Sequence, residues 1–364
     1  MESIHVVPRL APPVGGVGDY ALLLADELRK AHGIKTRFIV ANTGWQGPSE
    51  VNGFSVAKVS ANDADSLLAL LTRDASDGRP VLLHYVGYGY AKRGCPFWLV
   101  QALTKWRRRA SSNRLITMFH ELYARGPVLS SSFWNSPFQR WLATRLATLS
   151  DACATNMARH AQFLARRAPA QRGRIAVTPV FSTVGEAPDS PSLSARAPHL
   201  AIFGGARWQD DAFTKYRDAL RSACELLQIE RIITIGAPTA AAADFDLPVE
   251  MRGILPAAEV SRCLSRVRVG LLNYFSGYLG KSTIFAGYCA HGVMPLFCAP
   301  NHSEPDGLVG GRHYVVASQI TEPLSPEAMQ QIADQATEWY SGHSIAKTAT
   351  RVAGALREGM FLPC

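Results

Sequence analysis

The stretch Gly277-Tyr-Leu-Gly-Lys-Ser-Thr-Ile-Phe-Ala-Gly-Tyr-Cys-Ala-His-Gly-Val-Met-Pro-Leu296 follows an apolar, strand-like run at residues 267–274 and leads into a helical pattern. A strand followed closely by a helix is typical of an α/β unit. This order places Lys281, Ser282 and Thr283 at the start of the helix. The first N–H groups of a helix have no partner inside it, and the helix dipole adds positive character there. We therefore predict that these three residues hold the phosphate groups of a ligand.

Two other interpretations of this stretch were considered. The ending Gly280-Lys-Ser-Thr283 is also that of the Walker A loop, which needs a glycine five positions before Gly280. Position 275 is Phe, so the sequence excludes that motif. The simpler alternative is an ordinary helix start, in which Ser282 and Thr283 cap the helix and Lys281 is solvated.

Length and composition favour a folded α/β chain of two domains. The 364 residues are 47% hydrophobic and only 18% charged, which argues against disorder. The net charge of +9 favours anionic partners such as phosphates or an acidic lipid surface. The seven cysteines are scattered without a CxxC pair, so no zinc site or disulfide framework is expected, and a reducing compartment fits. No signal-like start or membrane-spanning apolar run is present, so we expect a cytoplasmic protein.

Strand-like and helix-like segments alternate along the whole chain. Apolar runs at residues 81–83 and 115–119 are typical of buried parallel strands, and helical patterns follow them. The alternation predicts two doubly wound Rossmann-like α/β domains that face each other across a cleft. We expect an N-terminal domain at 1–185, a proline-containing linker at 186–198, and a C-terminal domain at 199–340. The tail at 341–364 is expected to be helical and to cross back.

The first strand-to-helix junction contains several glycines. Gly16, Gly18 and Ala21 fit the dinucleotide fingerprint GxGxxG/A in form. The preceding loop is long, however, and the second strand ends in Asn42 where an acidic residue would hold the ribose. The interpretation that we favour is that Gly16 and Gly18 let a ligand approach the backbone. The alternative is a flexible loop capped by Asp19.

Polar residues also follow two other predicted strands. His120 and Glu121 come directly after the apolar run at 115–119, where active-site groups collect in α/β folds. A histidine there suits proton transfer or hydrogen bonding to a sugar hydroxyl. The first strand of the second half ends in Gly204-Gly205-Ala-Arg207, and this predicts close approach of phosphates with a bidentate pair from Arg207. The alternatives are a structural histidine and a tight turn with a solvated arginine.

Two segments combine aromatic and basic residues. The predicted helix at 98–109 and the segment 132–141 both contain two tryptophans, and the first also contains four Lys or Arg residues. A basic aromatic helix can lie on an anionic membrane. Packing of one helix face against the core, with the basic face in solvent, explains the first segment equally well. The second segment walls an acceptor site or packs in the interior.

Together these residues resemble the GT-B glycosyltransferases, in particular the glycogen-synthase-like family 4, over most of the chain. The similar segments are Pro12–Tyr20, Phe119-His-Glu121, Ile175–Val180, Phe203–Arg207 and Ala290–Leu296. The resemblance implies that Gly16, Gly18, Asp19 and Tyr20 lie beside the donor and acceptor. It also implies that His120 contacts the transferred sugar, and that residues 203–207 open the nucleotide-binding domain.

One feature of that family is missing here. Family members carry two acidic residues, with seven residues between them, at the donor site. In this chain the corresponding positions are Gly287 and either Leu279 or Ser276, so both carboxylates are absent. Lys281 would then supply charge that other members place elsewhere.

The sequence therefore predicts a glycosyltransferase that moves a sugar from a nucleotide-sugar to an acceptor hydroxyl. Retention of configuration is implied by the resemblance, and no cofactor or metal is expected. The expected acceptor is a saccharide or a lipid-linked molecule of cell-envelope polysaccharide or glycolipid synthesis, with peripheral contact to the inner face of an anionic membrane. The alternatives are a catalytically silent nucleotide-sugar-binding or scaffold protein, a nicotinamide-dependent enzyme, and a nucleic-acid-binding protein, which only the basic charge supports.

Overall fold

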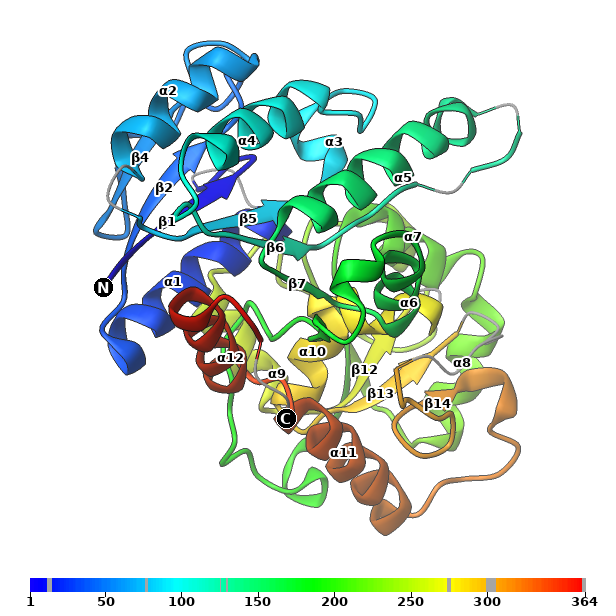
Figure 1. Ribbon diagram of the computed structural model, residues 1–364. Coiled ribbons are helices and arrows are strands. Elements are labelled where there is room, and N and C mark those ends of the chain that lie inside the picture. Colours follow the sequence, from blue (N-terminus) through cyan, green and yellow to red (C-terminus); the bar gives the residue numbers. More distant parts are fainter. Residues whose placement is uncertain are drawn as a thin grey trace. The chain divides into compact units, whose positions relative to one another are not determined.

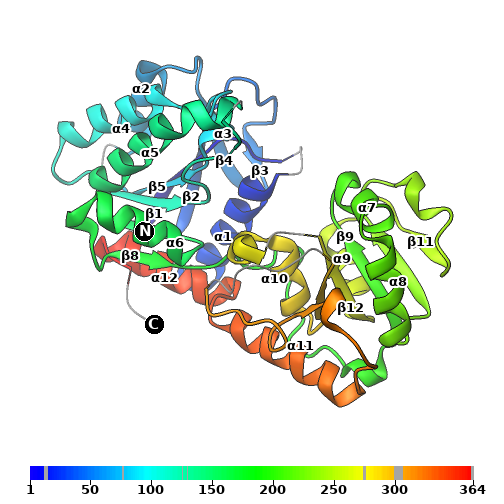
Figure 2. The ribbon, with the colours of Figure 1, turned by 90° about the vertical axis from the view of Figure 1, so that its right-hand side faces the viewer.

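A computed structural model of the chain describes residues 1–11, 15–75, 78–124, 126–128, 130–273, 276–298 and 306–361 (Figures 1 and 2). The chain forms two compact units. The first unit contains Met1–Pro179 together with Ile345–Cys364, and the second unit contains Val180–Ser344.

These boundaries differ from those expected from the sequence. The proline-containing segment 186–198, which we expected to link two domains, belongs to the second unit. Ala187 donates its backbone N–H to Ala290 at 3.0 Å, and the Arg196 guanidinium donates to the carbonyl of Val267 at 3.2 Å. The segment carries turn-forming residues because it winds around the second unit. The change of units occurs earlier, between Pro179 and Val180.

The first unit contains an eight-stranded sheet in the order β3-β4-β2-β1-β5-β6-β7-β8. All pairs are parallel except β3 with β4. The strands are β1 (Glu2–Val7), β2 (Lys35–Val40), β3 (Glu50–Val51), β4 (Phe54–Lys58), β5 (Val81–Tyr85), β6 (Leu115–Phe119), β7 (Ala152–Thr155) and β8 (Ile175–Val177). The order reverses between β1 and β5, which is the topological switch point where ligands bind in such sheets.

Helices cover both faces of this sheet. They are α1 (Gly16–His32), α2 (Ala64–Asp74), α3 (Gly87–Tyr90), α4 (Phe97–Arg109), α5 (Ser131–Leu149), α6 (Ala158–Arg167) and α12 (Ile345–Glu358). Because side chains alternate along a strand, Ile4 and Val6 of β1 pack in the core beneath α2 and α4, and Val7 packs in the core beneath α1. The C-terminal helix α12 lies beside α1, so the end of the chain returns to the first unit (Figures 1 and 2).

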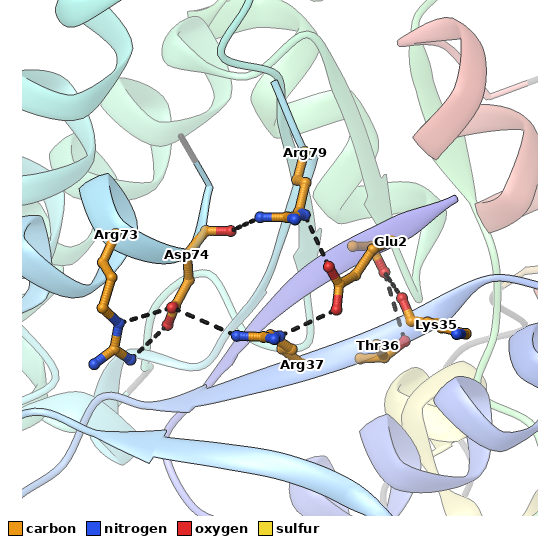
Figure 3. Close-up of polar contacts among 8 residues, drawn as sticks. Glu2, Lys35, Thr36, Arg37, Arg73, Asp74 and Arg79 are labelled. Atoms are coloured by element: carbon orange, nitrogen blue, oxygen red, sulfur yellow. Dashed lines mark hydrogen bonds and ion pairs between the residues drawn. The ribbon is translucent and has the colours of Figure 1, made fainter. Parts of the chain in front are cut away.

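An ion-pair network lies at the amino-terminal end of the first sheet (Figure 3). The Glu2 carboxylate pairs with Arg37 at 3.1 Å and with Arg79 at 2.8 Å. The buried Asp74 carboxylate at the end of α2 is held by Arg73 at 2.8 Å and by Arg37 at 3.8 Å. The network joins β1, β2 and α2 at the end of the sheet that lies opposite to the carboxyl ends of the strands. Its position therefore indicates a role in stability, since ligands bind at the carboxyl ends.

The second unit contains a six-stranded, fully parallel sheet in the order β11-β10-β9-β12-β13-β14. The strands are β9 (Ala197–Phe203), β10 (Arg231–Ile235), β11 (Val249–Met251), β12 (Val267–Leu272), β13 (Met294–Phe297) and β14 (Val315–Val316). The α-helices are α7 (Ala206–Phe213), α8 (Arg217–Leu226), α9 (Ala257–Leu264), α10 (Thr283–Ala290) and α11 (Pro326–Ser341). Short 3-10 turns complete the chain, of which Ser276–Lys281 bears on the site. Both sheets have the classical doubly wound strand order, so the predicted pair of Rossmann-like units is confirmed.

None of the helices in the described part of the chain is both long enough and apolar enough to span a membrane.

Candidate functional site

The second unit contains a pocket of about 190 Å³ at the point where its strand order reverses, between β9 and β12. Rossmann-like sheets bind their ligands at this position, because the loops of the two neighbouring strands diverge there and leave a crevice. The pocket is lined by residues from the ends of both strands, from α7, and from the start of α10: Ile202, Phe203, Trp208, Leu271, Leu272, Asn273, Lys281, Ser282, Thr283 and Ile284.

Three of the predicted phosphate-binding residues meet in this pocket. Lys281, Ser282 and Thr283 all line it, and α10 begins at Thr283 as the helical pattern predicts. The Ser282 hydroxyl accepts a hydrogen bond from the backbone N–H of Phe285 at 3.2 Å, so it also serves as the helix cap. The Lys281 ammonium lies 4.9 Å from the centre of the Tyr278 ring, in cation–π contact. The pocket therefore combines a cation with the N-terminus of a helix.

Sequence reasoning missed Asn273 and Trp208 as pocket residues. The Asn273 amide donates to the carbonyl of Trp208 at 3.1 Å, which aligns the end of β12 with the first turn of α7. Its carbonyl oxygen, Oδ1, is buried and has no hydrogen-bond partner. A buried acceptor without a partner costs about 1–3 kcal/mol, and a hydroxyl of a bound ligand would remove that cost. The sequence contains a signal for Asn273, because this residue follows an apolar strand, as His120 does.

A buried tyrosine joins the two strands whose ends line this pocket. The Tyr288 hydroxyl of α10 donates to the carbonyl of Leu271 at 3.0 Å and accepts the N–H of Phe203 at 3.2 Å. It thereby joins β9 and β12 where their loops begin to diverge. A side chain at Gly270 would place its Cβ 2.7 Å from the Tyr288 ring, so glycine leaves the room that the ring occupies. Burial raises the pKa of Tyr288, which keeps the hydroxyl protonated as a donor.

The glycines at the end of β9 lie close to the pocket, whereas Arg207 is not part of its lining. Gly204 has φ of 149°, a conformation that favours glycine, and a Cβ there would lie 3.2 Å from Ile284 in the pocket wall. Gly205 caps the N-terminus of α7. Arg207 lies on the exposed side of that helix, outside the lining of the pocket. Its bidentate contact with phosphate stays a prediction, because no ligand contact of Arg207 is part of this pocket.

In the first unit, His120 is the end of a chain of three buried histidines. His120 Nε2 lies 3.2 Å from Nδ1 of His84, and His84 Nε2 lies 3.4 Å from Nδ1 of His5. His5 and His84 come from β1 and β5, the two strands at the switch point, and His120 follows β6. The Tyr20 ring of α1 packs edge-on against His120 at 5.1 Å. The chain of rings therefore runs through the sheet interior to the carboxyl end of the sheet.

The tautomers of the three rings follow from burial. His5 Nε2 has no hydrogen-bond partner, and an unpaired N–H costs more in the interior than an unpaired lone pair. With the proton of His5 on Nδ1, His5 would donate to His84, and His84 would in turn donate from Nδ1 to Nε2 of His120. His120 then carries its own proton on Nδ1. This arrangement makes His120 a hydrogen-bond donor in its neutral form.

The other predicted residues of the first unit have mixed positions. Glu121 is half-buried beside His120, and its N–H lies 3.4 Å from the carbonyl of Tyr85. Asp19 accepts the N–H of Gly15 at 3.2 Å, and burial raises the pKa of its carboxyl group. Tyr20 was predicted on the acceptor side but is buried. Its ring packs edge-on against His120, and its place on the acceptor side stays a prediction.

The two glycines at the start of α1 also differ from each other. Gly18 is buried, and a Cβ there would lie 2.7 Å from the carbonyl oxygen of Arg9. Glycine is needed at 18 because the chain packs closely against itself there, and the approach of a ligand to this backbone stays a prediction. Gly16 is exposed, with open space around its Cβ position. The neighbouring residues 12–14 of the predicted loop lie outside the described residues.

In the described part of the chain, no group of three His, Cys, Asp or Glu side chains is placed to hold a metal ion.

The buried histidines predict that acid destabilises the first unit. Burial lowers the pKa of His5 from 6.5 to about 3, and burial together with the neighbouring rings lowers that of His84 as well. On unfolding both rings regain their ordinary pKa, so below pH 6.5 the unfolded chain binds protons that the folded chain excludes. Their stabilising contribution is complete above pH 6.5 and falls with pH by about 1.4 kcal/mol per unit for each ring. Urea unfolding between pH 7.5 and 4.5 measures the slope, from which His5→Leu should remove about 1.4 kcal/mol per pH unit; a flat profile would contradict the prediction.

Comparison with known proteins gives matches in structure only. No protein-family model matches the sequence, and no curated protein matches it. Among solved structures, a UDP-N-acetylglucosamine 2-epimerase from Listeria monocytogenes superposes with a TM-score of 0.57 at 11% identity, covering 100% of this chain and 98% of its own. An α,α-trehalose-phosphate synthase (UDP-forming) from Burkholderia xenovorans, in complex with glucose-6-phosphate, gives 0.56 at 10% identity, covering 98% and 100%.

A third solved structure is an α-glucosyltransferase in complex with UDP and a 13-mer DNA, with a TM-score of 0.53 at 9% identity over 97% of this chain and 98% of that one. Identities this low establish the fold and no more. The chain has the pair of Rossmann-like units found in the GT-B glycosyltransferases and their structural relatives.

Proposed function

We propose that the chain is a nucleotide-sugar-dependent glycosyltransferase whose donor binds in the pocket of the second unit. The observation that carries the proposal is the composition of that pocket. Lys281 and the N-terminus of α10 lie at the strand switch point, beside the unpaired Asn273 Oδ1. A cation with helix N–H groups suits a diphosphate, and a lone buried acceptor suits a ribose or sugar hydroxyl.

In the proposed chemistry, this pocket stabilises the leaving nucleoside diphosphate. Departure of a nucleoside diphosphate places negative charge on phosphate oxygens and positive charge on the sugar ring. Lys281 and the first N–H groups of α10, which begins at Thr283, stabilise the phosphate side. Their charge takes the part that a divalent metal plays at other diphosphate sites. The acceptor hydroxyl attacks on the side of the leaving group, with retention of configuration, as the resemblance to family 4 implies.

In this proposal, His120 contacts the transferred sugar. Its Nδ1–H, set by the donation from His84, hydrogen-bonds to a sugar hydroxyl or ring substituent and orients the reacting carbon. Glu121 lies beside it as a second polar group at the carboxyl end of β6. The acceptor is a saccharide or a lipid-linked molecule, in keeping with a role in envelope polysaccharide or glycolipid synthesis.

The absence of the family's acidic pair has a local structural explanation. Gly287 lies inside α10, where a Cβ would be 3.5 Å from Val184 and 3.7 Å from Leu264. A carboxylate built on this position would enter apolar surroundings, which is costly without a partner. Leu279 is likewise buried. The surroundings of Gly287 and Leu279 are thus mostly apolar, with the Ser182 hydroxyl 3.8 Å from the Cβ position at 287. A catalytically silent nucleotide-sugar-binding protein is the competing proposal.

The test is a thermal-shift screen against UDP, GDP, ADP, CMP and TDP, their sugar conjugates, and NAD(H). A ligand that binds only the folded chain stabilises it by about 2.7 kcal/mol at a concentration of 100 times Kd. We expect one nucleoside diphosphate to raise the unfolding midpoint, and Lys281→Ala to weaken its affinity about 10- to 100-fold through loss of a charge-assisted contact. Lys215→Ala is the matched control. That lysine also lies over a tyrosine ring, at 4.8 Å, but outside the pocket lining.

The outcomes separate the competing functions. Binding of a nucleotide-sugar with neither transfer nor hydrolysis would establish the silent protein. A shift with NAD(H) alone would establish a dinucleotide enzyme. Interconversion of UDP-N-acetylglucosamine with its C2 epimer, without an acceptor, would replace transfer by the reaction named for the Listeria structure. A shift that Lys281→Ala leaves unchanged would place the ligand elsewhere.

A further inference from the structure

In the first half of α5, apolar side chains face the solvent and polar side chains face the interior. Trp134, Phe138 and Trp141 recur at the spacing of one helix face, and they are 67%, 55% and 56% exposed. The opposite face buries the polar residues Ser136 and Gln139. A helix that only packs on its sheet would place the rings inside and the polar groups outside. This helix therefore presents a surface that water does not favour.

The reversed orientation is fixed by hydrogen bonds of the buried face. The Gln139 side-chain oxygen accepts the N–H of Ala124 at 2.7 Å, and its amide donates to the carbonyl of Arg93 at 3.0 Å. Both ends of the amide are thus satisfied inside the unit. Rotating α5 to bury its rings would break both bonds and expose Gln139, so the aromatic face stays outside.

The aromatic face extends beyond α5. Phe97 at the start of α4 is 47% exposed, and its ring centre lies 6.2 Å from that of Phe138 and 6.1 Å from that of Trp141. Phe133 adds a ring in contact with Trp134 at 5.5 Å. We call these five residues the aromatic patch: Phe97, Phe133, Trp134, Phe138 and Trp141. Contiguous exposed rings of this kind mark an interaction surface.

The whole net charge of the chain lies in the same part of the sequence. Residues 81–150 contain ten Lys and Arg and a single acidic residue, Glu121. The rest of the chain contains 28 residues of each sign, which balances. Exposed bases flank the patch: Arg145 lies one turn after Trp141 on the same helix face, and Lys92 and Arg93 lie in the loop that Gln139 holds against α5. Two bases of the range pair with carboxylates outside it, Lys105 with Asp65 and Arg107 with Asp151. The exposed bases beside the patch favour an acidic partner.

An anionic lipid bilayer would bind both the exposed aromatic rings and the exposed bases. Tryptophan and phenylalanine enter the boundary between headgroups and acyl chains, because both rings are apolar and the indole N–H of tryptophan can reach water. Lysine and arginine near the surface each add attraction to anionic headgroups. A protein partner would need a matching apolar groove with acidic rims, whereas a bilayer needs only the rings and the charge that the surface provides.

We propose that the aromatic patch and the bases beside it dock the first unit on an anionic membrane. The inference does not depend on sugar transfer, since it rests on surface residues of α4 and α5 alone. It would, however, place a lipid-linked acceptor next to the enzyme. The rings insert between headgroups, while Lys92, Arg93 and Arg145 remain at the charged surface.

The test is co-sedimentation of the full chain with vesicles of 30% phosphatidylglycerol in phosphatidylcholine, beside vesicles of phosphatidylcholine alone. We expect binding to the anionic vesicles at low salt, weakening at high salt, and at least tenfold weaker binding to the neutral ones. The triple variant Trp134→Ser/Phe138→Ser/Trp141→Ser should lose at least tenfold in affinity. Ile254→Ser, which changes a 78% exposed side chain of the second unit, should bind like the unchanged chain.

Single-charge variants separate specific docking from general attraction. Arg145→Gln should weaken binding about fivefold, as expected for one base at the surface. Arg172→Gln removes an exposed charge of the same unit outside residues 81–150 and should have less effect. Circular dichroism checks that the variants fold. Equal binding to neutral vesicles, full binding by the triple variant, or absence of binding at low salt would overturn the proposal. So would sedimentation showing that the patch instead joins two copies of the chain.

Discussion

Replacing His120 by alanine is expected to slow sugar transfer by about 10²- to 10³-fold, the usual effect of removing a placed hydrogen-bond donor from a transition state. The ring lies at the end of the chain from His5 through His84, at the carboxyl end of the first sheet. Nucleotide affinity should stay within about twofold, because the phosphate-binding residues belong to the second unit. Steady-state kinetics with the donor found by the ligand screen would show a loss in kcat with little change in donor KM.

Variants of the same chain distinguish placement from folding. His120→Gln keeps a side-chain N–H donor and should recover part of the rate that His120→Ala loses. His84→Phe removes the group that sets the His120 tautomer and should cost about tenfold, since the ring can then present either nitrogen to the substrate. If His120→Ala transfers sugar within threefold of the unchanged chain, the proposed role of His120 is wrong. A reduced unfolding midpoint in every variant would also point to a structural role.

The second large effect is expected from Gly236→Ala. Gly236 follows β10 with φ of 132°, and a Cβ there would lie 2.0 Å from the carbonyl oxygen of Gly204. The obstacle is backbone, which cannot rotate away as a side chain can. The two glycine turns must separate, and this displaces the end of β9 that forms one wall of the pocket. We expect a loss of about 3 kcal/mol or more in stability, from backbone strain and steric overlap together.

Hydrogen exchange of the β9 and β10 amides is the suitable measurement, since it reports the stability of the second unit alone. Gly253→Ala is the matched control, because Gly253 also has a left-handed φ, of 68°, but has open space where its Cβ would be. It should cost only about 1–2 kcal/mol of backbone strain. Equal losses in the two variants would show that the approach of Gly236 to Gly204 is not the source of the effect. Nucleotide binding by Gly236→Ala should weaken along with its stability.

The helices show where local sequence information ends. The helical pattern at residues 213–227 predicts a single helix there, but α7 ends at Phe213 and α8 begins at Arg217. The break follows from packing, because the Phe213 ring contacts Phe245 at 5.4 Å, far away in sequence. For α5 the sequence left open whether its rings pack inside or face outward. Two hydrogen bonds of Gln139 to distant backbone groups decide that they face outward.

The sequence by itself determined the alternation of strands and helices, because buried parallel strands are continuous apolar runs and helices show a 3.6-residue period. It also determined the helix start at Lys281–Thr283, because capping and dipole effects act within one turn. Only the tertiary structure decided which polar strand residues meet. His5 and His84 are 79 positions apart, and they come within 3.4 Å because β1 pairs with β5. The order of strands in a sheet depends on the apolar surface that is buried on both of its faces by residues far apart in the sequence. A local sequence pattern does not show that burial.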